Sequence, residues 1–124
     1  ATTLGHGTAT VSTVEHVLAA LHGAGIDNAR IEVNGPEVPI MDGSSAPFYA
    51  AIQSVGTESQ LQVRPVLALR RKVELKLAEK WVVAEPASRL EIHGSIEWDH
   101  PSIGYQEFHY QEGKTSFDEL ASAR

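Results

Sequence analysis

The sequence predicts an α+β fold, because two hydrophobic periods follow one another along the chain. Residues 13–55 contain two segments with apolar side chains at helical spacing. From residue 66 onward, apolar and polar side chains alternate with the period of two that is typical of strands. Helices followed by a run of strands are characteristic of the α+β class.

The first segments predict a strand–helix–strand unit over residues 8–34. Residues 1–11 indicate a strand or hairpin, with the glycine-flanked His6 at its turn. A helix is expected from about Thr13 to His22. Residues 29–33 then alternate like a half-buried strand. The apolar face of the helix is expected to consist of Val14, Val17, Leu18 and Leu21.

A stiff loop leads to the second helix. Residues 35–45 are rich in turn formers and contain two prolines. A helix from about Ala46 to Val55 follows, and Pro47 fits its first turn. The polar stretch from Gly56 to Gln62 is the candidate linker between two parts of the chain.

The second half is expected to be an antiparallel meander of four strands with one solvated face. Its strands are expected near residues 66–77, 80–85, 90–98 and 106–111. Ser116-Phe117-Asp118-Glu119 then opens a helix with a capping box.

Composition excludes several classes of protein. The 42% hydrophobic content is sufficient for a folded core, and the net charge of −6 disfavours nucleic acid as the main partner. The chain has no cysteine, so disulfides, cysteine nucleophiles and cysteine zinc sites are excluded. Histidine, aspartate and glutamate remain as plausible metal ligands. No apolar run approaches the length of a transmembrane helix.

Glu15 and His16 are the main candidates for chemistry. An imidazole beside a carboxylate at a helix start suits a metal-dependent hydrolase, in which histidine binds the metal and glutamate handles protons. Both residues lie off the predicted apolar face. The alternative for Glu15 is helix capping, because Ser12 and Glu15 have the spacing of a capping box. The alternative for His16 is a solvated side chain on a polar face.

The other histidines are weaker candidates. His93 and Glu97 share the polar face of one predicted strand, and His109 is expected on a neighbouring strand, so these three could form a site. His22 sits where a helix C-terminus favours a cationic ring. His100 precedes a proline and is expected to form a turn hydrogen bond.

Three motifs in order resemble one family, the UDP-3-O-acyl-N-acetylglucosamine deacetylases of lipid A biosynthesis, which are zinc amidases. They are Ser-Thr-Val-Glu-His at 12–16, Gly-Ile-Asp-Asn at 25–28 and Pro-Glu-Val-Pro-Ile-Met-Asp-Gly-Ser at 36–44. Trp-Asp-His-Pro at 98–101 resembles the aromatic-x-His-Pro segment of the family's second domain. The resemblance spans nearly the whole chain and is strongest through residue 55.

The resemblance implies two similar α+β domains, each a two-layer sandwich of a sheet on helices, with the active site between them. Residues 1–60 would be the later part of the first domain and residues 65–124 the earlier part of the second. His16 matches a zinc ligand, and Glu15 matches the general base that activates the attacking water. Asp42 and Gly43 lie in a family motif, for which turn and cap roles are expected.

The same resemblance implies the reaction and its setting. Zn²⁺ would assist hydrolysis of the substrate's acetamide, giving UDP-3-O-acyl-glucosamine and acetate, the committed step of lipid A biosynthesis. The substrate would be a nucleotide-sugar lipid precursor, and the location the cytoplasm of a Gram-negative-type bacterium. No nucleic-acid partner or transmembrane segment is expected.

Not every residue of the family's site is matched. The family's other two zinc ligands, a His and an Asp four residues apart, and its general-acid His are expected beyond Arg124. The chain is therefore expected to be an internal fragment with little activity alone and with apolar faces prone to self-association. The alternative is a non-catalytic α+β binding module derived from that family, which binds a partner through open sheet edges or uncovered helix faces.

Overall fold

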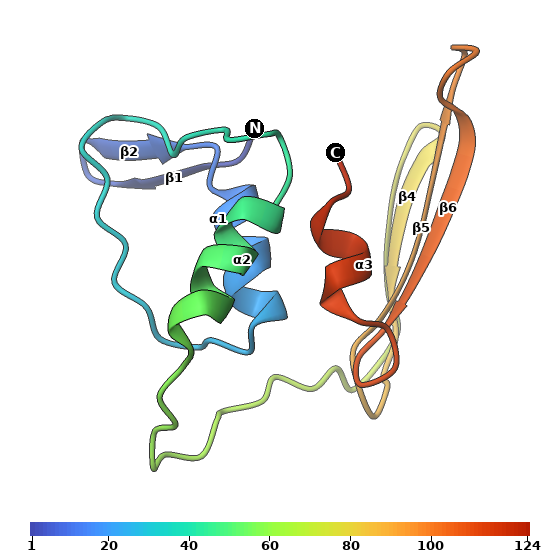
Figure 1. Ribbon diagram of the computed structural model, residues 1–124. Helices are drawn as coiled ribbons and strands as arrows, with labels where there is room; N and C mark the ends of the chain where they lie inside the picture. Colours follow the sequence, from blue (N-terminus) through green and yellow to red (C-terminus); the bar gives the residue numbers. More distant parts are fainter. The chain divides into compact units, whose positions relative to one another are not determined.

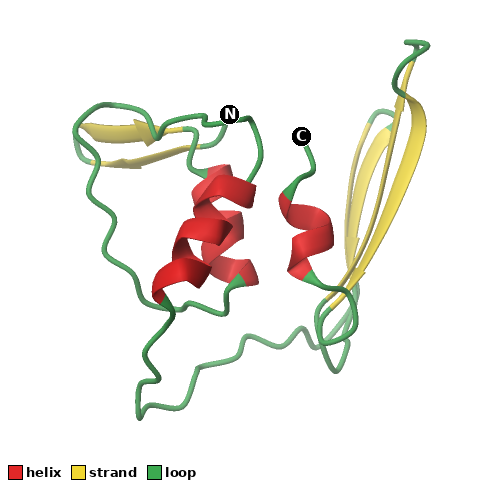
Figure 2. Cartoon of the chain, in the orientation of Figure 1, coloured by secondary structure: helices red, strands yellow, loops and turns green.

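The computed structural model describes all residues from Ala1 to Arg124. The chain forms two compact units: Ala1–Arg64 together with Ser116–Arg124, and Pro65–Thr115. The polar stretch predicted as a linker, Gly56 to Gln62, contains neither helix nor strand. All the helices belong to the first unit (Figures 1 and 2).

The first unit begins with an antiparallel hairpin, which confirms the prediction for residues 1–11. Strand β1 (Thr3–His6) pairs with β2 (Ala9–Ser12). Between the strands Gly7 has φ +60°, a left-handed conformation that glycine adopts without steric cost. The turn therefore lies just after His6 rather than on it.

Helix α1 (Glu15–Gly23) begins two residues later than predicted, and its expected capping box is absent. The N-cap position is Val14, which has no side-chain cap. The Ser12 hydroxyl lies 3.1 Å from the Thr3 hydroxyl on the paired strand instead. Because Ser12 ends β2, its backbone belongs to the strand and cannot also open the helix.

The other two helices follow their sequence signals. Helix α2 (Ala46–Val55) has the predicted bounds, with Pro47 in its first turn. Helix α3 (Phe117–Ala121) is short and is capped by Ser116, whose hydroxyl accepts a hydrogen bond from the amide of Asp118 at 3.3 Å.

The three helices contact one another through small and aromatic residues. Ala20 of α1 is completely buried. A Cβ built on Gly23 would lie 2.2 Å from the Phe117 ring of α3, so this ring occupies the space that a side chain at 23 would need. The Phe117 ring also packs on Tyr49 of α2, with 4.9 Å between ring centroids. Helices α1 and α2 lie side by side in Figure 1.

The packed face of α1 is therefore not the predicted leucine-rich face. At about 100° per residue, Ala20 lies roughly 110° and Gly23 roughly 170° from the centre of the predicted stripe. Leu18, on the predicted stripe, is 42% exposed. The helical spacing of apolar residues identifies an apolar stripe on α1. Close approach of another helix requires small side chains, and the small residues determine which face of α1 packs here.

Residues 29–33 do not form the predicted strand. Alternation favours a strand only where a neighbouring strand satisfies its backbone groups, and no strand of the chain pairs with this segment. Its charged side chains pair locally instead, with Arg30 2.6 Å from Glu32.

The second unit consists of two separate hairpins and not of the predicted four-stranded meander. Strand β3 (Val73–Leu77) pairs with β4 (Lys80–Ala84), and β5 (Glu91–Trp98) pairs with β6 (Gly104–Gln111). Residues 66–72, which were expected to begin the first of these strands, form no strand. Alternation identified the paired segments but carries no information on which pairs join into one sheet.

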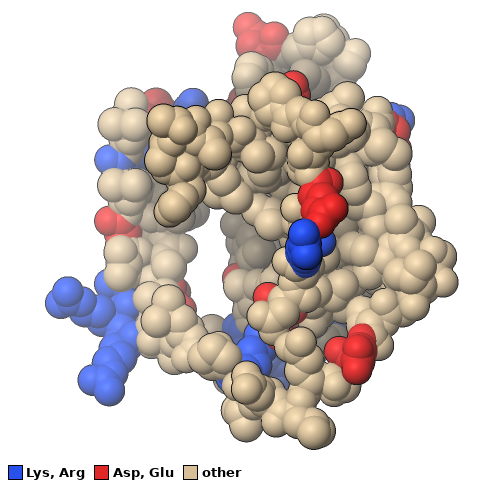
Figure 3. Space-filling model, turned by 90° about the vertical axis from the view of Figure 1, so that its left-hand side faces the viewer, with Lys and Arg blue, Asp and Glu red and all other residues tan.

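The mixed α+β class predicted from the sequence is confirmed. The assignment of residues 1–60 and 65–124 to two similar domains stays a prediction. None of the helices has the length and apolar character needed to cross a membrane. On the face shown in Figure 3, basic and acidic side chains occur in small scattered groups among uncharged residues.

Candidate functional site

The candidate site lies where β2 turns into α1. Between them stands Thr13, which is buried and has φ +56°. A β-branched residue in this left-handed region is an outlier, which persists when the surrounding structure holds it there. The turn redirects the chain within two residues, so that Glu15 and His16 open the helix directly.

The segment after Gly35 holds this turn in place. The Ser12 amide donates to the Pro36 carbonyl at 2.9 Å, and the Val38 amide donates to the Ser12 carbonyl at 3.1 Å. Between these two bonds, the Thr13 hydroxyl donates to the Glu37 carboxylate at 2.5 Å. Three hydrogen bonds to one short segment therefore fix the point at which α1 begins.

Glu15 is partly exposed, and its carboxylate meets the backbone just before strand β1. Its carboxylate accepts a hydrogen bond from the Thr2 amide at 2.9 Å. This bond favours the ionised form and lowers the pKa of Glu15 below its ordinary value. Glu15 is thus a carboxylate at neutral pH, the form that can accept a proton.

His16 lies on the packed face of α1. It stands one helical turn before Ala20, on the side that carries Gly23 and meets Phe117. Its side chain is half-buried. His16 is therefore on the same side of α1 as the residues that pack, and is not fully exposed to solvent.

The motif at Asp42-Gly43-Ser44 forms the turn into α2. Asp42 accepts hydrogen bonds from the Ser44 hydroxyl at 2.7 Å and from its amide at 3.0 Å. The hydroxyl bond is the main cause that lowers the pKa of Asp42 below 3.8. Gly43 has φ +85°, which favours glycine, and the Arg124 guanidinium donates to the Asp42 carbonyl at 3.0 Å.

Of the two serines that precede α2, only Ser44 caps the helix with its side chain. The Ala46 amide donates to the Ser44 hydroxyl at 3.2 Å. Ser45 occupies the N-cap position without a side-chain cap and donates instead to the Ala121 carbonyl of α3 at 3.1 Å.

His16 alone does not make a metal site. Within the whole chain, the one group of three possible ligands close enough to share an ion consists of Glu91, His93 and His109. His16 is not part of it. A zinc ion held for catalysis has three protein ligands, so the residues around His16 do not by themselves fit such an ion.

The remaining histidine candidates are placed as follows. His93 and His109 are opposite one another on β5 and β6, as expected, but the third member of their group is Glu91 and not the predicted Glu97. Glu97 lies opposite Tyr105, four cross-strand pairs along the hairpin from His93 and His109. His100 accepts a hydrogen bond from the Ser102 amide at Nδ1, 3.2 Å away, within the turn after β5.

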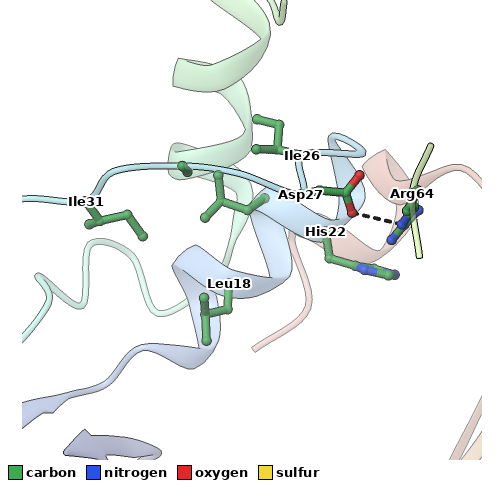
Figure 4. Close-up of a pocket in the computed structure, with 8 residues that line it drawn as sticks. Leu18, His22, Ile26, Asp27, Ile31 and Arg64 are labelled. Carbon is green, nitrogen blue, oxygen red and sulfur yellow. Dashed lines mark ion pairs between the residues drawn. The ribbon is translucent and has the colours of Figure 1, made fainter. Parts of the chain in front are cut away.

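A cavity of about 300 Å³ lies beside the C-terminal half of α1. Leu18, Ile26 and Ile31 line it together with His22, and at one end Asp27 pairs with Arg64 at 2.8 Å (Figure 4). Neither Glu15 nor His16 lines this cavity. It is therefore separate from the candidate site.

Sequence reasoning missed Thr13 and Glu37 as parts of the site. Thr13 was expected inside the helix, because nothing in its residue type signals a positive φ. Glu37 lies between two prolines, which indicated a stiff loop. That signal identified the right segment but not the residue.

Taken together, the chain is a mixed α+β protein with a Glu–His pair at a constrained strand–helix junction. It matches the family model LpxC: UDP-3-O-acyl N-acetylglycosamine deacetylase over residues 1–124. The chain belongs to this family.

Curated relatives carry the same description. Proteins named UDP-3-O-acyl-N-acetylglucosamine deacetylase are 42% identical in Syntrophus aciditrophicus, 46% in Myxococcus xanthus and 44% in Anaeromyxobacter sp.. The alignments cover 100%, 100% and 99% of this chain but 40%, 40% and 41% of the relatives. The chain thus spans about two fifths of the length of the relatives it matches.

Proposed function

We propose that the protein to which this chain belongs is a zinc-dependent deacetylase of the bacterial cytoplasm. It would hydrolyse the acetamide of UDP-3-O-acyl-N-acetylglucosamine to UDP-3-O-acyl-glucosamine and acetate, in lipid A biosynthesis. Family membership and the names of the relatives support the substrate class. The observation that carries the proposal is the Glu15–His16 pair, held at the start of α1 by the bonds from Ser12 and Thr13 to residues 36–38.

In this proposal the two residues have different roles. His16 supplies one imidazole ligand to Zn²⁺, whose other ligands this chain does not provide. The ion, when bound, supplies Lewis-acid polarisation of the amide carbonyl. Glu15, ionised at neutral pH, accepts a proton from the attacking water as the general base. The leaving amine would receive its proton from a histidine outside residues 1–124, as the family resemblance implies.

The residues around the pair position it. Thr13 and Glu37 fix the direction in which α1 leaves the hairpin, and with it the positions of Glu15 and His16 at the helix start. Since a displacement of about 1 Å can cost 100-fold in rate, this rigid junction is a functional requirement of the proposal.

The test uses the full-length protein with Glu15→Gln and His16→Ala, and with His22→Ala as a matched control on the same helix. Zinc content and deacetylation are measured for each. Glu15→Gln should keep zinc and lose about 10²–10⁴-fold in turnover, the usual contribution of a general base. His16→Ala should lose both, and His22→Ala neither. Normal turnover in Glu15→Gln, or normal zinc content in His16→Ala, would overturn the assignment.

The chain of residues 1–124 alone should be inactive. One imidazole cannot hold a catalytic zinc ion. Deacetylation by this chain that is lost in its Glu15→Gln variant would contradict the proposal that ligands outside it are needed.

A further inference from the structure

The polar face of the β5–β6 hairpin brings two imidazoles and a carboxylate together. His93 and His109 are direct cross-strand partners, and their rings stack with 3.8 Å between centroids. Glu91 lies two residues before His93, so its side chain is on the same face. One ligand atom from each of the three residues lies within 4.8 Å of the other two.

The carboxylate of this cluster is oriented by a neighbour. Gln111 is the cross-strand partner of Glu91, and its side-chain amide donates to the Glu91 carboxylate at 2.6 Å. One carboxylate oxygen is thereby occupied and the other remains available. An outer hydrogen bond of this kind is what ligating carboxylates generally have in metal sites.

We propose that Glu91, His93 and His109 bind a divalent transition-metal ion of the zinc type. Two imidazoles and one carboxylate are a ligand set that suits Zn²⁺, Co²⁺, Ni²⁺ or Cu²⁺ and not Mg²⁺ or Ca²⁺, which prefer oxygen. Water would complete the coordination of an exposed ion.

The geometry allows the site to close around an ion. Metal–nitrogen bonds of about 2.0–2.1 Å with tetrahedral angles need ligand atoms about 3.3 Å apart. The present 4.8 Å limit exceeds this by about 1.5 Å, which side-chain rotation can supply because all three residues are exposed. The backbone need not move, since the strand register already places the three residues together.

The opposite face of the hairpin supports an outward-facing site. Ile92, Ile96 and Trp98 lie there on β5, and Phe108 lies there on β6. A hairpin with one apolar face packs by that face, which leaves the histidine face accessible to ions. The site belongs to the second unit and is independent of the deacetylase chemistry proposed at His16.

The experiment is a titration of the 124-residue chain with Zn²⁺ by calorimetry, repeated with Co²⁺ for its absorption spectrum. The wild-type chain should bind one ion per chain. His93→Ala and His109→Ala should abolish this binding, and Gln111→Ala should weaken it by about 10–100-fold as an outer-sphere partner. His16→Ala and His100→Ala are controls and should bind like the wild-type chain.

Two outcomes would overturn the proposal: absence of stoichiometric binding by the wild-type chain, or binding that survives in His93→Ala and His109→Ala. Tryptophan fluorescence, with Trp98 on β5, checks that each variant keeps the hairpin. Gln111→Ala provides a variant in which all three ligands remain, so its weakened binding cannot come from a lost ligand. Binding lost in His16→Ala instead would place the ion at the deacetylase site and refute the hairpin site.

Discussion

The conformation of Thr13 allows a sharp test of the junction that carries Glu15 and His16. The test compares Thr13→Ala with Thr13→Gly. Both substitutions remove the hydroxyl and its bond to Glu37, so they differ in the Cβ atom alone. At φ +56° a residue with a Cβ is strained by about 1–2 kcal/mol, and glycine is not.

The structure gives the expected magnitudes. Losing a hydrogen bond to a charged acceptor costs about 1.5–3 kcal/mol, and the low end applies because Glu37 is exposed. Thr13→Ala should therefore lower the free energy of unfolding by about 1.5–2 kcal/mol. Thr13→Gly should be about 1 kcal/mol more stable than Thr13→Ala, which reverses the usual order of the two residues.

The assay is urea denaturation followed by far-UV circular dichroism. All helices lie in the first unit, so this signal reports the unit that contains Thr13. Tryptophan fluorescence is the internal control, because Trp81 and Trp98 both lie in the second unit and should be unaffected.

Glu37→Gln tests the partner of the same bond. Combined with Thr13→Ala, it should cost less than it does alone, with a coupling energy of about 0.5 kcal/mol or more. If the glycine variant is less stable than the alanine variant, the backbone at Thr13 is not strained and the argument for a constrained junction fails. Purely additive effects of the two substitutions would show that the Thr13–Glu37 bond contributes nothing.

Four further outcomes are expected. Gly23→Ala should destabilise the first unit by about 1–3 kcal/mol, because the added Cβ clashes with the Phe117 ring. Phe117→Leu should reduce that cost in the double variant. Equal stability of Gly23→Ala and the wild type in urea would contradict this packing. Gly43→Ala should cost about 1 kcal/mol or more because of its φ of +85°, whereas Gly35→Ala, which has open space and no positive φ, should change little by the same measurement. Hydrogen bonds from Ser44 lower the pKa of Asp42 below 3.8, so the ionised carboxylate stabilises the fold above that pH and this stabilisation is lost as the pH falls below it. Asp42→Asn should therefore flatten the acid side of the curve of stability against pH, and an unchanged curve would refute this. The isolated chain, with large apolar side chains exposed along its hairpins, should self-associate in sedimentation velocity, and a monodisperse monomer would count against it.

Local signals in the sequence were sufficient for most individual elements. Pro47 and the period after it located α2, Ser116 located α3, and alternation located the paired strands. These signals succeed because each reflects backbone chemistry within a few residues. The α+β class follows from their order.

What the sequence did not predict depends on contacts between distant residues. Residues 29–33 have a strand pattern and no partner, and the packed face of α1 was decided by Ala20 and Gly23 rather than by its leucines. For the candidate site, Glu15 and His16 could be named from their residue types. Thr13 could not, because its conformation is imposed by hydrogen bonds to a segment more than twenty residues away.

The first unit is discontinuous along the chain, and this has a consequence for folding during synthesis. Helices α1 and α2 are complete by Val55, but the helix that packs on them begins at Phe117, roughly sixty residues later. At about 5–20 residues per second, the ribosome needs roughly 3–12 s to make the intervening segment. During that time the surface of α1 around Gly23, which Phe117 later covers, stays exposed on the nascent chain. It is open to chaperones until α3 has been made.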